Sequence, residues 1–170
     1  MSTTISFPSY GYFSVRVSKQ GGTLLLRSNS ERAFVLAQLQ DLLGVRTLLE
    51  DPESRKRLSA HVDLLAYSIN GSHVQLLIFS LSRADARALA HLVSQRLQQY
   101  QSEYCGYLVA EAHSVSIKRL RGKHQALSQS IDIHCTHQDW EYDRYSSIGF
   151  YLHDRRGDWM RIWRLTKLYD

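Results

Sequence analysis

Two apolar segments of similar length, separated by a three-residue turn, place the strongest constraint on the fold of this chain. The segments read HVDLLAYSI and HVQLLIFSL, and Asn70-Gly71-Ser72 stands between them. Apolar runs of this length on either side of an Asn-Gly step are typical of a β-hairpin. We therefore expect residues 61–69 and 73–81 to form two antiparallel strands.

Further strands are predicted on both sides of this hairpin. The segment GYFSVRVSK at residues 11–19 alternates apolar and polar side chains, which is the pattern of a half-buried strand. Gly21-Gly22 supplies a turn after it. Later in the chain, HSVSIKRLRGKH alternates Val115 and Ile117 with polar neighbours. This pattern predicts a fourth strand that runs into a basic turn.

Helices are predicted between these strands by their capping residues. Ser28 with Glu31 makes a capping box, and Gly44 stands where a helix is expected to end. Ser82 with Asp85 opens a second helix in the same way. Its predicted apolar stripe consists of Ala86, Leu89, Ala90, Val93, Leu97, Tyr100 and Tyr104. A third helical segment is expected over residues 123–135.

The resulting order, β-α-β-β-α-β, predicts an α+β fold with the ferredoxin-like arrangement: an antiparallel sheet with helices on one face. With 170 residues, 44% of them hydrophobic, the chain is long enough for one sizeable core. We expect a single domain, with a core of about residues 10–138. An aromatic-rich helical tail is expected over about residues 139–170.

Charge and cysteine content narrow the classes of partner. The formal net charge of +5 favours an anionic partner, nucleic acid before membrane. Cys105 and Cys135 lie far apart without a CxxC spacing, so neither a disulfide framework nor a thiolate zinc site is indicated. No export signal or transmembrane segment is expected. These features predict a cytoplasmic, nucleoid-associated protein.

The hairpin and the tail also resemble a known family. AYSINGSHVQLLIF resembles the strand-turn-strand of the single-tyrosine HUH transposases, especially the REP-associated tyrosine transposases, in which His-hydrophobe-His follows a short turn with Asn. DWEYDRYSSIGFYL followed by DWMRIWRLTKLY is similar to the family's ending, where Trp/Tyr-Ser-Ser precedes an aromatic-Leu pair and a short helix. The resemblance implies a ferredoxin-like domain that binds hairpin-forming single-stranded DNA beside a palindrome.

In active members of that family, two His and an Asn or Gln hold a divalent metal, and a helix Tyr attacks the scissile phosphate. Carried over to this chain, the resemblance implies metal positions at His73, Gln75 and His134, and it puts Ser130 in the place of the Tyr. Either His and Gln have exchanged places in a working site, or the site has decayed and its polar groups bond to one another or to water. The expected cofactor is accordingly none, or a weakly bound Mg²⁺ or Mn²⁺.

Basic residues form two candidate phosphate-binding groups. The first lies in KRLRGKH and comprises Lys118, Arg119, Arg121 and Lys123. The second lies in the tail and comprises Arg155, Arg156, Arg161 and Arg164. In the same tail, Trp159, Ile162, Trp163, Leu165 and Tyr169 are predicted to form the apolar side of a last helix.

The leading functional hypothesis is a catalytically inactive, transposase-like module that binds hairpin or palindromic DNA, as a monomer or a homodimer. The alternative is an active metal-dependent DNA nickase or strand transferase that uses His73, Gln75 and His134. RNA binding on the sheet face is a weaker third hypothesis, because the strands lack the aromatic pattern that stacks bases in RNA-binding sheets.

Overall fold

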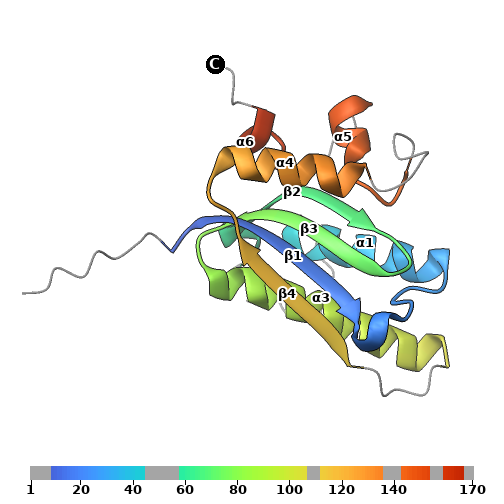
Figure 1. Ribbon diagram of the computed structural model, residues 1–170. Helices are drawn as coiled ribbons and strands as arrows, with labels where there is room; N and C mark the ends of the chain where they lie inside the picture. Colours follow the sequence, from blue (N-terminus) through green and yellow to red (C-terminus); the bar gives the residue numbers. More distant parts are fainter. Residues whose placement is uncertain (1–8, 45–57, 107–111, 136–142, 154–158, 167–170) are drawn as a thin grey trace, which may run out of the picture.

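One four-stranded antiparallel sheet forms the centre of the protein (Figure 1). The computed structural model describes residues 9–44, 58–106, 112–135, 143–153 and 159–166. The strands are β1 (Gly11–Lys19), β2 (Val62–Ile69), β3 (His73–Ser80) and β4 (His113–Arg119). Their order across the sheet is β2-β3-β1-β4, and all three neighbouring pairs are antiparallel. The predicted hairpin is confirmed, and β1 has the predicted bounds.

The helices interleave with these strands in the predicted order. They are α1 (Asn29–Leu43), α3 (Arg83–Tyr104), α4 (Lys123–His134), α5 (Ile148–Leu152) and α6 (Trp163–Thr166). A 3-10 turn, η1 (Gln20–Gly22), follows β1 and contains Gly21 and Gly22 at positive φ. The α+β class is therefore confirmed. No helix in the described ranges is long and apolar enough to cross a membrane.

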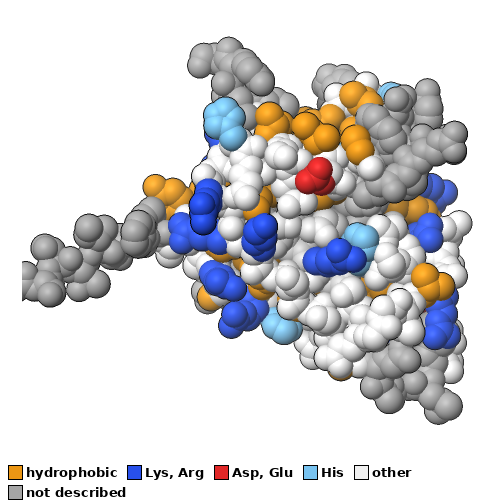
Figure 2. Space-filling model, viewed as in Figure 1, with side chains coloured by type: hydrophobic (Ala, Val, Ile, Leu, Met, Phe, Trp, Pro, Cys, Tyr) orange, Lys and Arg blue, Asp and Glu red, His pale blue; other side chains and the backbone are white. Residues whose placement is uncertain are grey.

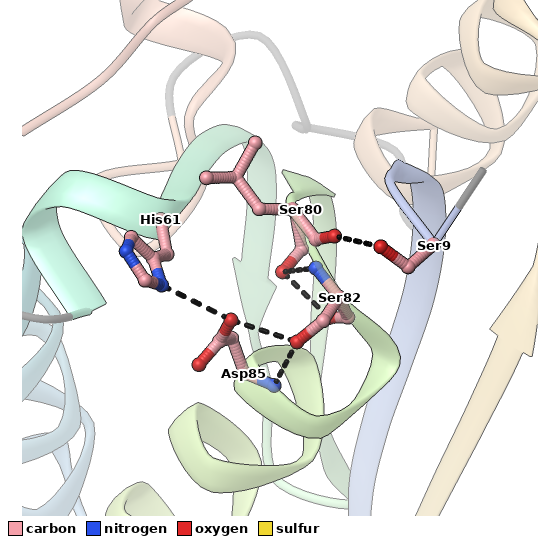
Figure 3. Close-up of polar contacts among 6 residues, drawn as sticks. Ser9, His61, Ser80, Ser82 and Asp85 are labelled. Carbon is pink, nitrogen blue, oxygen red and sulfur yellow. Dashed lines mark hydrogen bonds and ion pairs between the residues drawn. The ribbon is translucent and has the colours of Figure 1, made fainter.

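Both predicted capping boxes are present. The Ser28 hydroxyl accepts a hydrogen bond from the Glu31 amide at 3.2 Å, and the Glu31 carboxylate accepts one from the Arg27 amide at 2.8 Å. At the start of α3, the Ser82 hydroxyl accepts from the Asp85 amide at 3.0 Å and donates to the Asp85 carboxylate at 2.7 Å (Figure 3). The bonds to the Ser28 and Ser82 hydroxyls satisfy the Glu31 and Asp85 amides, which the first helical turn would otherwise leave without partners.

The main hydrophobic core lies between the sheet and the helices α1 and α3, which Figure 1 shows behind the sheet. Phe13, Val15 and Val17 point into it from β1 because residues two apart on a strand face the same way. Each Leu, Val or Phe that is fully buried here contributes about 1.5–3 kcal/mol relative to its exposed state. The two helices therefore cover this face as predicted.

Helix α4 lies on the opposite face, so the expectation of helices on one face only is wrong for this element. Ala126 and Ile133 of α4 pack against Leu65 and Leu77 of the sheet in a second hydrophobic cluster. The cause lies in β2, where all residues from 64 to 69 are buried. A strand that is apolar on both faces needs cover on both. Figure 1 shows α4 running along the β2 side of the sheet.

The tail closes the free edge of β2. Isolated bridges join Leu64 to Met160 and Ser68 to Ser146, and the Ser147 amide donates to the Tyr67 carbonyl. An edge strand offers unpaired backbone groups, which the tail satisfies here. The predicted apolar side of a continuous last helix is wrong within the described residues, because the helix there is only α6. Trp159 and Leu165 are buried and Trp163 is 46% exposed, whereas Tyr169 lies outside the described residues.

The predicted stripe of α3 is also shorter than expected. Tyr104 is 75% exposed and Tyr100 is half-buried, stacked on Phe34 with ring centroids 4.2 Å apart. The buried part of the stripe ends at Leu97. One turn later, Gln101 is buried and donates to the carboxylate of Glu31 at 2.7 Å. A polar contact between Gln101 and the start of α1 therefore takes the buried position at this end of α3, beside the stacked rings of Tyr100 and Phe34.

Candidate nucleic-acid interface

The sheet face opposite α1 and α3 is polar where α4 does not cover it. Arg16 of β1 pairs with Gln75 of β3 on one side and with Ser116 of β4 on the other. Alternation places six further polar residues on the same face. Ser18, His73, Ser114 and Lys118 are at least partly exposed, whereas Ser14 and, from β2, Ser68 are buried. The strands β1, β3 and β4 contain no Asp or Glu. The surface formed by β3, β1 and β4, called the polar face below, therefore offers hydrogen-bonding groups and positive charge, and these three strands contribute no carboxylate.

His73 is tied into the turn that precedes its strand. The Ser72 hydroxyl lies 2.7 Å from Nδ1 of His73 and donates to Oδ1 of Asn70 at 2.9 Å. Nη2 of Arg16 also lies 3.3 Å from Nδ1, and Nε2 faces the side-chain amide of Asn70 at 3.3 Å. Burial, followed by the positive charge of Arg16, lowers the pKa of His73. Both nitrogens of a neutral imidazole are thus engaged.

Gln75 and His134, the other two expected metal positions, have separate partners. The Gln75 amide donates to the Ser14 hydroxyl at 2.8 Å on the polar face. His134 is buried behind β2, where Nε2 lies 2.7 Å from the Ser147 hydroxyl and the ring meets Tyr151 edge-on at 5.2 Å. Burial lowers the pKa of His134 to about 4. The imidazole of His134 is thus engaged with the tail, which differs from the expected cluster with His73 and Gln75.

This arrangement does not fit a metal site of the expected type. His73 and Gln75 do share a face, as two residues of one strand should, but His134 is directed to the tail. Among the described residues, no group of three or more His, Cys, Asp or Glu side chains is placed to hold a metal ion. Of the three residues expected to hold a metal, Gln75 is hydrogen-bonded to Ser14 and His134 to Ser147.

Ser130, at the position of the family's nucleophile, lies inside the protein. Its side chain is 4% exposed and hydrogen-bonds to Tyr151, whose hydroxyl donates to the Leu65 carbonyl. Burial raises the pKa of Tyr151 far above its usual range. Both hydroxyl groups therefore join α4 and the tail to β2, and neither is presented to a substrate in this conformation.

The predicted basic group between β4 and α4 is at the surface. Lys118, Arg119 and Arg121 are exposed and Lys123, the first residue of α4, is half-buried. The chain turns at Gly122, where a φ of 117° favours glycine. Figure 2 shows Lys and Arg side chains gathered on the left of the viewed face, at the end where β4 runs into α4. These four residues are called the basic corner below.

Arg119 is held in place within the basic corner. Its Nη2 donates to the Tyr10 carbonyl at 3.0 Å, and its guanidinium lies over Gly11, where an added Cβ would be 3.4 Å from Nε. The glycine lets the planar group approach the backbone of β1 closely. A guanidinium fixed in this way loses less conformational entropy when it binds a phosphate.

The described basic residues of the tail have structural partners instead. Arg164 pairs with Asp63, and its guanidinium lies 4.0 Å from the centroid of Phe79 and 4.9 Å from that of Trp163. Arg161 lies 3.9 Å from the same carboxylate. These contacts fasten α6 to β2 and β3, so the structure gives Arg161 and Arg164 a packing role. Arg155 and Arg156, the other two tail candidates, lie outside the described residues.

A second row of basic residues, which was not predicted from the sequence, lies on α3. Arg83, Arg87 and His91 are all exposed on α3, and their four-residue spacing puts them on one side of the helix. Nη2 of Arg83 donates to the Ile117 carbonyl of β4 at 3.2 Å. The row, called the α3 row below, therefore starts beside β4. The i, i+4, i+8 spacing was the signal that could have identified it.

Comparison with known proteins does not assign the chain to a family. No protein-family model matches the sequence, and no curated protein matches it. The function is therefore inferred from the polar face and the basic corner.

Proposed function

We propose that this protein is a DNA-binding module with a ferredoxin-like, HUH transposase-like domain, which holds hairpin or palindromic single-stranded DNA without cutting it. The observation that carries the proposal is the continuity of the carboxylate-free β3-β1-β4 face with the basic corner. The strand order β2-β3-β1-β4 and the antiparallel pairing fit the ferredoxin-like arrangement.

The chemistry of this surface suits a phosphate backbone. Lysine and arginine neutralise phosphates and release counterions, while Ser hydroxyls and a Gln amide can donate hydrogen bonds to phosphate oxygens and base edges. Arg16 and Lys118 bring positive charge onto the polar face itself, and the basic corner extends it at one end. A carboxylate on these strands would repel the ligand, and the three strands contain none.

Binding without cleavage is supported by the placement of Ser130 and His134. An attacking group must reach the phosphorus atom, but Ser130 is buried against Tyr151. A metal that polarises the phosphate needs converging ligands, but His134 bonds to Ser147. A module of this kind would act on DNA in the cytoplasm, at the nucleoid.

Wild-type protein is expected to bind a labelled DNA hairpin with a strong salt dependence. Four phosphate contacts at the basic corner correspond to a slope of log K against log salt of roughly −3. Fluorescence anisotropy between about 50 and 300 mM salt would measure it, with an RNA hairpin of the same sequence and heparin as competitors. The proposal fails if DNA does not bind, or if heparin or RNA competes as well as unlabelled hairpin DNA.

Incubation of the protein with hairpin DNA and Mg²⁺ or Mn²⁺ is expected to give no covalent adduct on a denaturing gel. The reason is that the hydroxyl groups of Ser130 and Tyr151 are committed inside the protein. An adduct mapped by mass spectrometry to any Tyr or Ser would instead establish the nickase, with its His73, Gln75 and His134 site, as the function.

A further inference from the structure

The two edges of the sheet are treated differently. The tail covers the edge of β2 through backbone bonds from Tyr145, Ser147 and Arg161. At the other edge, β4 pairs with β1 alone among the described strands. In its sequence, HSVSIKR, the exposed residues Ser114, Ser116 and Lys118 alternate with the half-buried Val115 and Ile117. Positive charge on an edge strand discourages pairing with other chains. Further positive charge lies outside the strand, on α3.

This additional positive charge belongs to the α3 row. Within this row, Arg83 contacts the edge strand through the Ile117 carbonyl. Arg87 and His91 lie one and two turns further along α3, about 6 and 12 Å from Arg83 along the helix axis. The acidic residue nearest to Arg83 and Arg87 on this helix, Asp85, is buried and bound to Ser82 and His61. The row therefore presents its positive charge to the surroundings without an exposed carboxylate beside it on α3.

We propose that the β4 edge binds the double-stranded stem of the hairpin, with Lys118 and Lys123 on one phosphate backbone and the α3 row, beside Arg119, on the other. The inference rests on the proposed function and adds the location and the strandedness of the ligand. Lys118 points to the polar face, and Lys123 begins α4, which packs on that side of the sheet. Arg119 is paired with the core residue Phe13 and points to the other side, where α3 packs, so cations flank β4 on both sides.

The two-sided arrangement of cations indicates that the DNA bound here is double-stranded. A single strand offers one line of phosphates, which the basic corner and the polar face can bind by themselves. A duplex offers two lines, separated by a groove about 6 Å or 12 Å wide. An edge strand with its flanking cations in two layers can contact both lines at once.

The test removes the α3 row and compares two ligands. Arg83→Ala with Arg87→Ala is titrated by anisotropy with a fully paired hairpin and with an oligothymidine of equal phosphate number. We expect affinity for the paired hairpin to fall on the order of tenfold and its salt slope to flatten by roughly 1.8, because each phosphate contact in a duplex accounts for about 0.9. Affinity for oligothymidine is expected to change less than twofold.

A matched control removes two positive charges elsewhere. Arg27 and Arg144 are exposed and lie near the start of α1, where Tyr145 contacts Asn29. Arg27→Ala with Arg144→Ala should leave both affinities within twofold of wild type. Arg87→Ala alone keeps the Arg83 contact with β4, so it reports on binding if the double variant is unstable. Arg83→Lys with Arg87→Lys should restore most of the paired-hairpin affinity.

The outcomes separate this inference from the proposed function. Equal losses for the paired hairpin and oligothymidine would overturn the assignment of a duplex. An α3-row variant that binds like wild type, while alanines at the basic corner abolish binding, would overturn the inference and leave the proposed function standing. Absence of binding by the wild-type protein to either DNA would overturn both.

Discussion

Replacing Arg119, Arg121 and Lys123 together by alanine is expected to reduce hairpin affinity by a factor on the order of 100 to 1,000 at about 0.1 M salt, roughly tenfold for each phosphate that is no longer neutralised. All three lie at the basic corner, and Arg119 is fixed there by the Tyr10 carbonyl. The salt slope should flatten by between roughly 2 and 3. Anisotropy titrations at several salt concentrations would measure both quantities.

Two controls make this result interpretable. The Arg27→Ala, Arg144→Ala protein loses positive charge at the far end of the sheet and should bind the hairpin as wild type does. Arg119→Lys keeps the charge but loses the planar fork, so it should cost affinity while leaving the salt slope nearly unchanged. If the triple variant keeps its affinity and slope, the phosphates lie elsewhere and the basic corner is an ordinary solvated surface.

Acid is expected to destabilise the fold by about 2 kcal/mol between pH 7 and pH 5 through His134 alone. Burial lowers the pKa of this imidazole to about 4 in the folded state, whereas in the unfolded chain it titrates near 6.5. The unfolded state therefore binds the proton more readily over this range. The stabilisation is complete above about pH 6.5 and is lost as the pH falls through about 4.

Urea unfolding of wild type and of His134→Gln at pH 7 and pH 5 would measure this effect. The variant should lose most of that pH dependence, although it is less stable at pH 7 because Ser147 loses an imidazole partner. His124→Gln, at an exposed position on the same helix, is the matched control and should retain the wild-type pH dependence. Identical pH dependence in wild type and His134→Gln would contradict the burial of a neutral His134.

His113 adds to the acid sensitivity in the same direction. Burial, followed by the charge of Lys19, lowers its pKa to about 4. Its Nδ1 lies 2.9 Å from the Ser94 hydroxyl, between β4 and α3. Because His113 is only partly buried, its contribution is smaller than that of His134. The pH dependence that remains in His134→Gln is therefore expected to come in part from this residue.

Features fixed by neighbouring residues could be predicted from the sequence. The Asn-Gly-Ser turn and the two capping boxes depend on contacts within four residues, and all were found where expected. Gly44 was predicted after α1 as a helix-capping glycine, but its backbone conformation does not explain why glycine is needed there. Its φ of −91° is open to any residue. A Cβ there would lie 2.4 Å from the Gln40 carbonyl oxygen, so the position requires glycine because of space.

Features fixed by distant residues could not be predicted in this way. The direction of His134 depends on Ser147, and the burial of Ser130 depends on Tyr151, both from a tail whose docking no local pattern reports. Arg164 was named as a candidate phosphate-binding residue, but Asp63, about a hundred residues earlier in the sequence, pairs with it. Periodicity shows which side of a helix is polar, and it does not show which partner that side meets.

The network in Figure 3 has a consequence for how the molecule opens. Ser9 donates to the Leu81 carbonyl, the Leu81 amide donates to the His61 carbonyl, and Nδ1 of His61 lies 3.2 Å from the Asp85 carboxylate. The N-terminal ends of β1, β2 and α3 thus meet at the C-terminal end of β3. Partial unfolding of any of these segments would break contacts of the others. The amides at this junction should therefore exchange with solvent through cooperative opening of the whole sheet, and not through fraying of single ends.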